Sequence, residues 1–312
     1  MELVHSEAIA NNGTRSLAFG VIPAHHDEVL KINAFHSALC ALGLVLFGSQ
    51  ALALPVNLGV AGPADWTVLN VDTGTLSISG TGSINGNVGL NGGNLSDSGT
   101  SIKGNLVTSG TGNVSLSGGA TISGTTSKNP TLLSQAASAA AVASSTAAGF
   151  SSSGGGAGLS SIIYNNAGTI DLMAGVYNLT NLVLNNTTLV LTAGASYVFN
   201  ISGSLAMSAS EILDSTGANV LFNITRGAAS LSGGSVLDGI VLAPNATFSE
   251  SGGSLVGEII GGNISISGAK VQGLSAVPDS GSSVLLLGVG IGCLCISRKF
   301  GHYRRRLRLK QT

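Results

Sequence analysis

The sequence predicts a mainly β fold, an irregular parallel β-solenoid (β-helix) with one long Ala-rich α-helix alongside it. Three observations support this prediction: a glycine-centred motif returns at intervals of about one solenoid turn, apolar and polar residues alternate between the motifs, and glycine supplies 46 of the 312 residues. Only 9% of the residues are charged and 4% are aromatic, whereas ordinary globular chains carry ~25% charged residues. Regularly spaced Val, Ile and Leu argue against disorder. Stacked thin strands joined by many turns fit this composition best.

The glycine-centred motif predicts the turns of the solenoid. Residues 83–88, 101–106 and 121–125 share the pattern Ser/Thr-Ile-x-Gly, and their glycines are 18 and then 20 residues apart. A similar pattern returns at 235–240, 254–259 and 270–273, where the glycines are 18 and 16 residues apart. A repeat of this size suits one coil of a solenoid, because each coil buries its apolar residues only when it stacks on its neighbours.

Between the motifs, apolar residues alternate with polar ones at period two, the pattern of a strand with one buried side. The pairs are Leu76 and Ile78, Val114 and Leu116, Leu189 and Leu191, and Ile264 and Ile266. The same parity places Ile102 and Leu255 inside the solenoid and Ser101 outside. Gly-Gly pairs predict the corners, because glycine adopts positive φ at little cost. Asn87 and Asn105 occupy equivalent positions of two turns, and the sequence leaves open whether they stack as a ladder or only suit the turns.

One segment departs from this pattern and predicts a helix at about 130–149. Asn129 can cap it, and Pro130 suits its first turn. An apolar stripe follows at helical spacing, formed by Leu132, Ala136, Ala139, Ala143, Ala147 and Phe150, with Ser134, Ser138 and Ser145 on the other side. Such a thin stripe suits a helix that lies along a solenoid wall. The Ser- and Gly-rich segment 151–158 is expected to be a flexible linker.

Residues 29–53 predict an export signal with an apolar targeting helix. Lys31 precedes the apolar run 38–47, and the small residues Ala51 and Ala53 fit cleavage by signal peptidase after Ala53. A buried helix is the alternative, but the small-residue end favours cleavage. Residues 1–28 are unusual before such a signal, so we expect them to be a disordered or over-extended start, with translation beginning near Val29 or Leu30.

A second targeting segment is expected at 277–312. It begins with Val277, Pro278, Asp279, Ser280 and Gly281, continues with an apolar stretch at 284–296, and ends with a basic tail. The stretch is shorter than the ~20 residues of a plain spanning helix, and the bases after it favour a cytoplasmic end. Motif, apolar helix and basic tail together resemble the VPDSG-type members of the bacterial PEP-CTERM sorting signals. The resemblance implies processing at the motif by an exosortase-type membrane enzyme; a plain C-terminal anchor is the alternative.

The body between the two targeting segments, 54–276, consists of predicted turns, then the Ala-rich helix, then further turns. Its most characteristic segments are 65–69, the Ile-x-Gly-Asn turns, 197–203, 220–224 and 238–245. In this order they resemble the ice-binding-like adhesive domains, specifically the choice-of-anchor A group. The resemblance implies an irregular β-solenoid with one helix beside it, in secreted or surface proteins with varied anchors and a proposed adhesive role.

The body lacks most residue types that catalysis or metal binding requires. All 3 cysteines and all 5 histidines lie outside 54–276, which excludes a disulfide framework, a thiolate metal site and a Ser-His-Asp triad there. We therefore expect no catalytic residue, no metal ligand and no cofactor. A solenoid polysaccharide lyase would need convergent polar groups, but Asp238 and Glu258 are expected to point to opposite faces, because one precedes and the other follows its glycine; Arg226 is close to them in sequence. An excess of acidic over basic residues in the body argues against nucleic-acid binding.

These observations favour a non-enzymatic, secreted or cell-surface structural or adhesive protein. Its expected partners are signal peptidase, an exosortase-type sorting enzyme, an extracellular polysaccharide or cell surface and, before processing, the membrane through the C-terminal segment. The alternative is an ice-binding protein. Ice binding requires a flat, regularly repeated face, usually rich in threonine. It ranks second because the threonines, which include Thr73, Thr75, Thr81, Thr187 and Thr188, do not recur at turn spacing.

Overall fold

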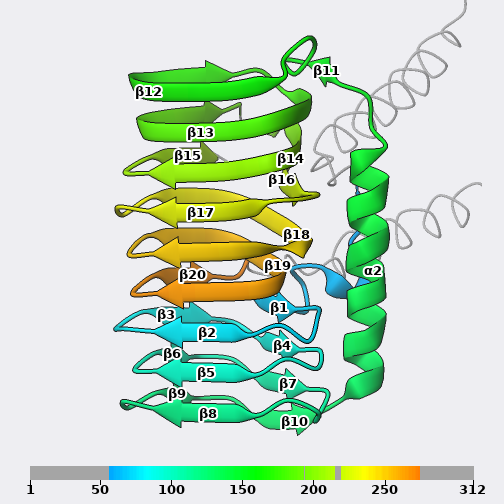
Figure 1. The fold of residues 1–312 in the computed structure, drawn as a ribbon, viewed down its shortest axis with the longest axis vertical. Coiled ribbons are helices and arrows are strands. Elements are labelled where there is room, and N and C mark those ends of the chain that lie inside the picture. Colours follow the sequence, from blue (N-terminus) through cyan, green and yellow to red (C-terminus); the bar gives the residue numbers. More distant parts are fainter. Residues whose placement is uncertain (1–55, 193, 215–218, 275–312) are drawn as a thin grey trace, which may run out of the picture. The chain divides into compact units, whose positions relative to one another are not determined.

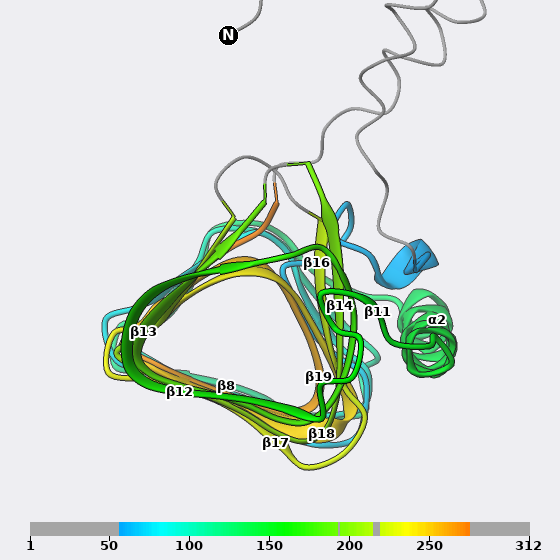
Figure 2. The ribbon, with the colours of Figure 1, turned by 90° about the horizontal axis from the view of Figure 1, so that it is seen from above.

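The computed structural model describes residues 56–192, 194–214 and 219–274, all within one compact unit that begins at Leu52. These residues form a parallel β-solenoid of about ten turns with a single α-helix beside it (Figure 1). Seen along its axis the solenoid has a triangular outline, and the helix lies outside one of the three sides (Figure 2). The predicted fold class is confirmed.

The chain first builds a lower stack and then an upper stack. The lower stack follows the short helix η1 (Gly59–Ala61) and contains β1 (Val68–Asn70), β2 (Leu76–Ser79), β3 (Ser83–Asn85), β4 (Val88–Leu90), β5 (Leu95–Ser98), β6 (Ser101–Ile102), β7 (Leu106–Thr108), β8 (Val114–Ser117), β9 (Thr121–Ile122) and β10 (Thr126–Lys128). Helix α2 (Pro130–Ala148) then leads to the far end of the molecule. The upper stack contains β11 (Ser153–Gly154), β12 (Ser161–Leu172), β13 (Gly175–Leu191), β14 (Ser196–Ser208), β15 (Glu211–Asp214), β16 (Asn219–Ile224), β17 (Ala228–Ser232), β18 (Val236–Ser251), β19 (Ser254–Ser267) and β20 (Lys270–Gln272).

The two stacks join into one continuous solenoid through strands that are far apart in sequence. The last turn of the upper stack, formed by β19 and β20, lies directly on the first turn of the lower stack. Ile259 pairs with Val68, Ile264 with Leu76, and Val271 with Ile84. All of these ladders are parallel, so the winding direction is the same on both sides of the junction.

Each turn contributes one strand segment to each of three faces, which we name for what covers or forms them. The helix face contains β1, β4, β7, β10, β16 and the segments 175–179, 196–201, 240–243 and 258–261. The serine face contains β2, β5, β8, β17 and the segments 161–165, 181–185, 204–208, 247–251 and 263–267. The charged face contains β3, β6, β9, β15, β20 and the segments 168–172, 187–191, 236–238 and 254–256.

The core is a set of apolar columns that run along the solenoid axis. Ile102 and Leu255 are both fully buried, which confirms the predicted parity, and Ser101 is half-buried on the outside. In the upper stack the rings of Tyr177, Phe199 and Phe222 stack inside the helix face, with successive centroids 4.9 and 5.0 Å apart. Offset aromatic stacking of this kind adds to the stabilisation from buried area.

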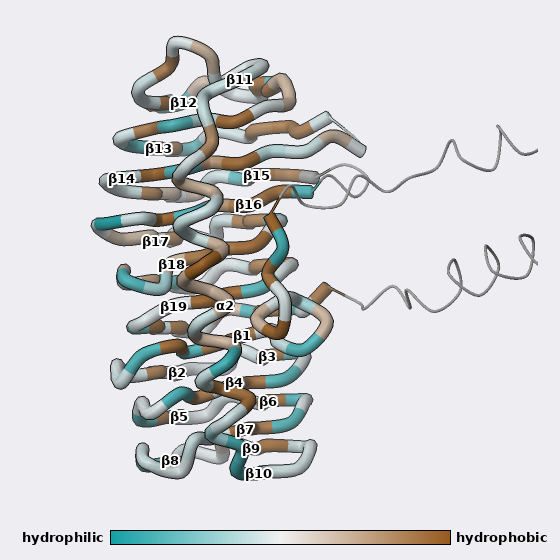
Figure 3. Tube along the Cα trace, turned by 90° about the vertical axis from the view of Figure 1, so that its right-hand side faces the viewer, coloured by the Kyte–Doolittle hydropathy of each residue, from teal (hydrophilic) through white to brown (hydrophobic). Residues whose placement is uncertain are grey.

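Helix α2 crosses the helix face from the lower to the upper stack (Figure 3). The Asn129 side chain accepts a hydrogen bond from the Leu132 backbone N–H at 3.1 Å, so the predicted cap is present. The buried residues are Leu133, Ala136, Ala140, Ala143, Ser144 and Ala147. The predicted stripe is therefore confirmed at three positions and wrong elsewhere: Leu132, Ala139 and Phe150 are only partly buried, because the helix is rotated toward Leu133 and Ala140. The serines at 134, 138 and 145 are exposed as expected.

An asparagine ladder fastens the second half of the helix to the upper stack. The side chains of Asn178, Asn200 and Asn223 lie in one outward column; the Asn200 amide donates to Asn178 Oδ1 at 2.8 Å, and the Asn223 amide donates to Asn200 Oδ1 at 2.9 Å. Asn200 also donates to the Ala147 carbonyl at 2.7 Å, and Asn223 donates to the Ser144 carbonyl at 3.0 Å. The ladder thus provides hydrogen-bond partners both for the buried asparagine amides and for backbone carbonyl groups of the helix.

The segment 151–158 is not the flexible linker that its composition predicts. Ser153 and Gly154 form β11, which pairs antiparallel with β13, and the Gly155 N–H donates to the Ala174 carbonyl at 3.0 Å. A Cβ atom at Gly156 would lie 2.0 Å from the Val176 carbonyl oxygen. The glycines are therefore needed for close backbone approach rather than for flexibility.

Asn87 and Asn105 do stack along the axis. The Asn105 backbone N–H donates to Asn87 Oδ1 at 3.0 Å, and the Thr125 N–H donates to Asn105 Oδ1 at 2.9 Å. The hydrogen bonds of this ladder therefore run from backbone N–H groups to side-chain oxygens, and they join successive turns where their strands bend.

The expected targeting segments lie outside the described residues. These are the start at 1–28, the export signal with Ala51 and Ala53, and the tail that begins at Val277, Pro278, Asp279, Ser280 and Gly281. Within the described ranges, no helix is long and apolar enough to cross a membrane.

Candidate functional site

The serine face carries a regular array of hydroxyl groups. In consecutive turns its strands read apolar-Ser-x-Ser, and the serines of neighbouring turns are register partners. We call this array the serine grid; it consists of Ser77, Ser79, Ser96, Ser98, Ser115, Ser117, Ser230, Ser232, Ser249, Ser251, Ser265 and Ser267. Every one of these side chains is exposed or half-exposed. Because strands are ~4.8 Å apart and alternate residues of one strand are ~6.7 Å apart, the hydroxyls repeat in two dimensions.

The grid is continuous only because the two stacks join. The strands β17, β18 and β19 of the upper stack provide one half of it, and β2, β5 and β8 of the lower stack provide the other. At the junction the Ser79 hydroxyl donates to Ser267 Oγ at 3.2 Å, across 188 residues of sequence. The non-sequential closure of the solenoid thus forms a surface that neither half has alone.

Most hydroxyls of the grid remain available to a ligand or to water. Ser117 and Ser232 donate to backbone carbonyls at 3.4 and 3.3 Å, and Ser79 donates to Ser267. The other grid hydroxyls make no hydrogen bond to protein atoms. The adjacent outward column behaves differently, since Asn263 and Asn94 accept hydrogen bonds from the backbone of the next turn at 3.1 and 2.9 Å. The flanking asparagines therefore hold the turns in register, while the serines face outward.

Toward the free end of the upper stack, the two outward columns of the serine grid continue with residues other than serine. Ile163, Val183 and Ala206 continue one column of the grid, and Asn165 and Asn185 continue the other. The Asn185 amide donates to Asn165 Oδ1 at 2.6 Å. This end of the serine face is therefore also uncharged, but it is more apolar.

No charged residue projects outward from the serine face, in contrast to the charged face. On the charged face, Asp171, Glu211, Asp238, Lys103 and Lys270 lie on its strands or directly after them. Aliphatic side chains such as Val190 and Val256 lie between them in the same columns. The serine face is thus the one exposed side of the solenoid that combines uniform chemistry with regular spacing.

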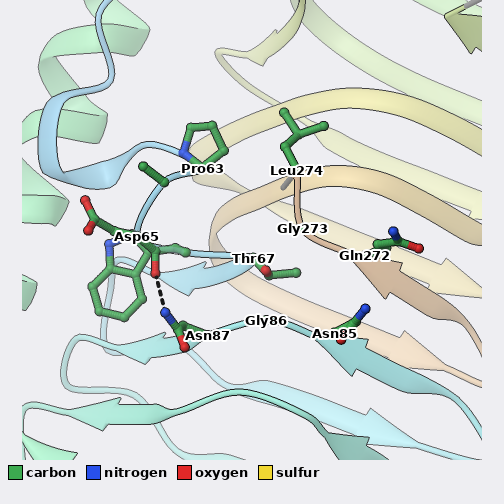
Figure 4. A pocket seen from close by; sticks show the side chains of 11 residues that line it. Pro63, Asp65, Thr67, Asn85, Gly86, Asn87, Gln272, Gly273 and Leu274 are labelled. Atoms are coloured by element: carbon green, nitrogen blue, oxygen red, sulfur yellow. Dashed lines mark hydrogen bonds between the residues drawn. The ribbon is translucent and has the colours of Figure 1, made fainter. Parts of the chain in front are cut away.

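The winding is interrupted at the corner between the charged face and the helix face, which we call the seam. There the upper stack ends at 272–274, and the lower stack begins at 63–67. Both segments line one pocket of about 230 Å³ together with Asn85, Gly86 and Asn87 (Figure 4). The Gly273 N–H donates to the Asn85 carbonyl at 3.1 Å, and the Asn87 amide donates to the Asp65 carbonyl at 3.0 Å. These bonds bridge the two ends of the winding.

Three carboxyl groups are buried on separate turns of the solenoid. Burial raises the pKa of Glu250 to about 8, and burial together with the nearby Asp65 charge raises the pKa of Glu258 well above its ordinary value. Burial also raises the pKa of Asp97, although hydrogen bonds from Thr100 oppose the shift. Glu250 and Asp97 point into the core from the serine face, whereas Glu258 lies on the helix face. The three acids are therefore structural features of separate turns.

The chemistry that a lyase would require does not assemble. Asp238 pairs with Val256 on the charged face, while Glu258 pairs with Ile240 on the helix face, so the two acids are separated because they lie on different sides of the solenoid, not because they point to opposite faces of one strand. Among residues 56–192, 194–214 and 219–274, no group of three or more His, Cys, Asp and Glu side chains could hold a metal ion. The processing residues Ala51, Ala53 and 277–281 lie outside these ranges.

The serine grid is the feature that sequence reasoning missed. The alternation at Leu76 and Ile78 predicts the buried side of a strand, and it does not by itself distinguish a binding surface on the side that carries Ser77 and Ser79. The signal was nevertheless present, because a Ser-x-Ser pair occurs at 77–79, 96–98, 115–117, 230–232, 249–251 and 265–267.

Fold and site define a solenoid with one flat, uncharged, hydroxyl-bearing face. The ice-binding-like family model matches residues 71–272, and the chain belongs to this family. No curated protein gives a significant match.

Solved structures of the same fold include ice-binding proteins from cold environments. One is from the Antarctic ascomycete Antarctomyces psychrotrophicus, with 21% identity, a TM-score of 0.52, and coverage of 71% of this chain and 99% of that one. Another is the glycosylated LeIBP from an Arctic yeast, with 21% identity, a TM-score of 0.52, and coverage of 74% and 99%. A third is from an Antarctic Flavobacteriaceae bacterium, with 20% identity, a TM-score of 0.51, and coverage of 71% of this chain and 48% of that one. At these identities the likeness establishes the fold alone.

Proposed function

We propose that the protein binds ice through the serine face. The observation that carries this proposal is the serine grid, an uncharged array of exposed hydroxyls that repeats in two dimensions on one rigid face. The family membership and the three solved ice-binding proteins of the same fold support it. The sequence alone favours an adhesive protein and leaves ice binding as the alternative. With the serine grid and the family membership included, ice binding is the better supported of the two functions.

The physical argument starts from the regularity of the ice surface. A crystal face presents water in a repeating lattice, so a protein gains most when its own groups repeat and do not move. Parallel ladders on all three faces hold the strands in register before binding, so little conformational entropy is lost on contact. A charged side chain would keep its own hydration shell and would be costly to bring against a lattice of fixed waters. Serine hydroxyls can both donate and accept, so they can join such a lattice directly or through ordered water.

We further propose that the protein acts outside the cell and is not an enzyme. In this proposal signal peptidase cleaves after Ala53, and an exosortase-type enzyme processes the tail at 277–281. The support is the order of small residues, apolar run, motif and basic tail in the sequence. The finer placement in the choice-of-anchor A group rests on a different resemblance, the order of the body segments 65–69, 197–203, 220–224 and 238–245. Loss of processing after the double change Pro278→Ala and Asp279→Ala would support the sorting signal, and unchanged processing would leave only a plain anchor.

Adhesion to an extracellular polysaccharide is the second candidate function. The exposed amides of Asn165 and Asn185 favour it, because amides and hydroxyls arranged in rows suit sugar hydroxyls as well. The same face would serve, so a polysaccharide that binds there should compete with ice.

Two single variants test ice binding, and each places one bulky side chain on a different exposed face of β19. Ser265→Tyr projects from the centre of the serine grid, whereas Ser254→Tyr projects from the charged face of β19. We expect the full chain to inhibit ice recrystallisation, Ser265→Tyr to lose most of this activity, and Ser254→Tyr to retain it, with similar melting temperatures for all three. Equal activity of the two variants would show that ice binding, if present, uses another surface. An inactive parent protein would refute the proposal.

A further inference from the structure

The lower end of the solenoid, formed by the last turn of the lower stack, is an uncovered edge (Figure 1). In the part of the chain that the structure describes, β8, β9 and β10 each pair with one neighbouring strand only. Val114 and Leu116 of β8 belong to inward columns, yet they are 41% and 43% exposed, whereas Leu95, the register partner of Val114, is 1% exposed. Ile122 of β9 is half-buried. This end therefore combines exposed apolar side chains with a free strand edge, which favours pairing with another chain.

The upper end is an edge of the same kind on two of the three faces. Among the described strands, β12 pairs only with β13, and it supplies the last segment of both the serine face and the charged face. Its inward residues Tyr164 and Ile170 are half-buried, whereas their register partners Leu184 and Leu189 are fully buried. On the helix face, β11 already pairs with β13. The upper end can therefore accept a strand on the serine face and another on the charged face.

The two ends present the same inward columns in the same register. One column runs through the ladders from Ile162 at the upper end to Val114 at the lower end. A second column runs from Ile170 to Ile122. Seen along the axis, the turns lie over one another (Figure 2). A second copy placed below the first would therefore set its Ile162 and Ile170 under Val114 and Ile122.

The charges of the two ends have opposite signs. Residues 98–160, which include the lower end, contain no acid and two bases, Lys103 and Lys128. Residues 161–214, which include the upper end, contain no base and three acids, Asp171, Glu211 and Asp214. Two lower ends repel each other, and so do two upper ends, whereas a lower end attracts an upper end. Charge therefore favours a head-to-tail contact over either symmetric contact.

The molecule already contains one junction of this form. Where the upper stack meets the lower stack, strands that no turn connects pair in parallel on all three faces, through β19 with β1, β19 with β2, and β20 with β3. Turns of this sequence therefore stack without a direct connection. Within one chain α2 links the two stacks, which raises their effective concentration. A contact between two chains lacks this link and should be weaker.

We propose that the protein assembles head to tail, with the lower end of one copy on the upper end of the next. The contact pairs β8 with segment 161–165 of the next copy and β9 with segment 168–172, and it covers Leu116 with Tyr164 of the next copy. Because the contact is heterologous, each row keeps one free end of each kind and can grow. The contact is no larger than one cross-section of the solenoid, so association should be weak and should rise with concentration. The inference does not depend on what the serine face binds.

The first experiment blocks one end at a time and follows the mass of the full chain in mild detergent by sedimentation velocity. Leu116→Asp blocks the lower end, and Ile170→Asp blocks the upper end. Each variant alone should associate at least ~10-fold more weakly than the parent, because the contact would bury an unpaired carboxylate. An equimolar mixture should form dimers that do not grow, since each variant retains the end that the other has lost. Ser115→Asp adds the same charge on the outward side of β8 and should lose much less.

Two results of this experiment would overturn the proposal. One is a parent chain whose mass does not increase with concentration. The other is strong association of Ile170→Asp alone, which would mean that two lower ends meet. Melting temperatures of the variants show whether each one is folded.

A second experiment leaves the inward columns unchanged. A photo-cross-linking residue, p-benzoylphenylalanine, replaces Ser117, whose outward column continues with Asn165 at the upper end. Trypsin, which cleaves after Lys and Arg, then separates peptide 104–128 from peptide 129–226. In the product with the mass of two chains, we expect a link from 104–128 to residues 161–172 of the next copy. A link between two 104–128 peptides, a link to residues 1–55 or 275–312, or the absence of a two-chain product would each overturn the head-to-tail contact.

Discussion

The serine face and the charged face are built on the same backbone but present different surfaces. Both consist of short parallel strands in continuous register, and both expose alternate residues. One exposes serine in turn after turn, while the other mixes acids, bases, valine and threonine. The fold therefore supplies flatness and spacing to both faces, and only the choice of outward residues distinguishes a candidate binding surface from an ordinary hydrated one.

The two faces also differ inside the solenoid. One inward column of the charged face is entirely aliphatic, and it includes Ile84, Ile102, Leu237 and Leu255. One inward column of the serine face contains two acids, Asp97 and Glu250, between apolar residues. The interior behind the grid thus contains buried acids, and the first predictions compare a buried acid behind each of the two faces.

The largest effect is expected from an acid placed behind the charged face. Ile102→Asp would bury a carboxyl group among Ile84 and Ile122, where no donor is available, and each turn depends on its neighbours. We expect a loss of ~3 kcal/mol or more in the free energy of unfolding, measured by chemical denaturation. Ser101→Asp, one position away and directed outward, is the control and should be mild. Equal damage from both changes would contradict the strand parity of this face.

Glu250 should make stability depend on pH. Its pKa in the folded protein is about 8 because of burial, against an ordinary value of 4.5. Between these values the folded state binds more protons than the unfolded state, so the contribution of Glu250 to the free energy of unfolding should fall as pH rises from about 5 to 8 and then level off. The shift corresponds to a loss on the order of a few kcal/mol. Denaturation curves at pH 5 and pH 9 measure it.

The matched variant for this pH dependence is Glu250→Gln, which keeps the shape of the side chain and cannot ionise. It should remove the part of the decline that belongs to Glu250 and leave the part that comes from Glu258 and Asp97, whose pKa values burial also raises. A decline that is unchanged in Glu250→Gln would mean that another group controls it.

The sequence predicted the turns but not how they are assembled. The glycine-centred motifs and the burial of Ile102 and Leu255 follow from local periodicity, which a single sequence contains. The junction of β19 with β1 and β2 does not, because nothing local states which distant strands are partners. The serine grid depends on that junction, so its full extent could be seen only in three dimensions. The prediction of a flexible linker at 151–158 is wrong because glycine allows close packing of backbones as well as flexibility.

The helix face differs from the other two faces because α2 covers its outward residues. An asparagine ladder on this face can therefore be compared with one on the exposed serine face. Asn223 is fully buried and bonds to Ser144 and Asn200. Asn223→Ala would leave these groups without a partner and should cost ~2 kcal/mol. Asn185→Ala removes a ladder asparagine from the exposed serine face and should cost less than ~1 kcal/mol. The two melting temperatures provide the test, and a larger shift for Asn185→Ala would contradict the proposed role of the buried ladder.

The smallest effect is expected at the corner shared by the serine and charged faces. In most turns this corner residue is a glycine with positive φ, for example Gly252 at 73° and Gly268 at 63°, but in one turn it is Ala209 at 48°. A left-handed conformation costs a non-glycine residue ~1–2 kcal/mol, whereas glycine loses ~0.5–1 kcal/mol of backbone entropy. Ala209→Gly should therefore raise the free energy of unfolding by up to ~1 kcal/mol. The reverse change, Gly252→Ala, should lower it by a similar amount, and its cost would come from the backbone alone, because no atom lies within 4 Å of the added Cβ. Neither change touches the grid, so ice activity should stay constant while the two melting temperatures move in opposite directions. A fall in stability for Ala209→Gly would mean that the alanine is not strained at this corner.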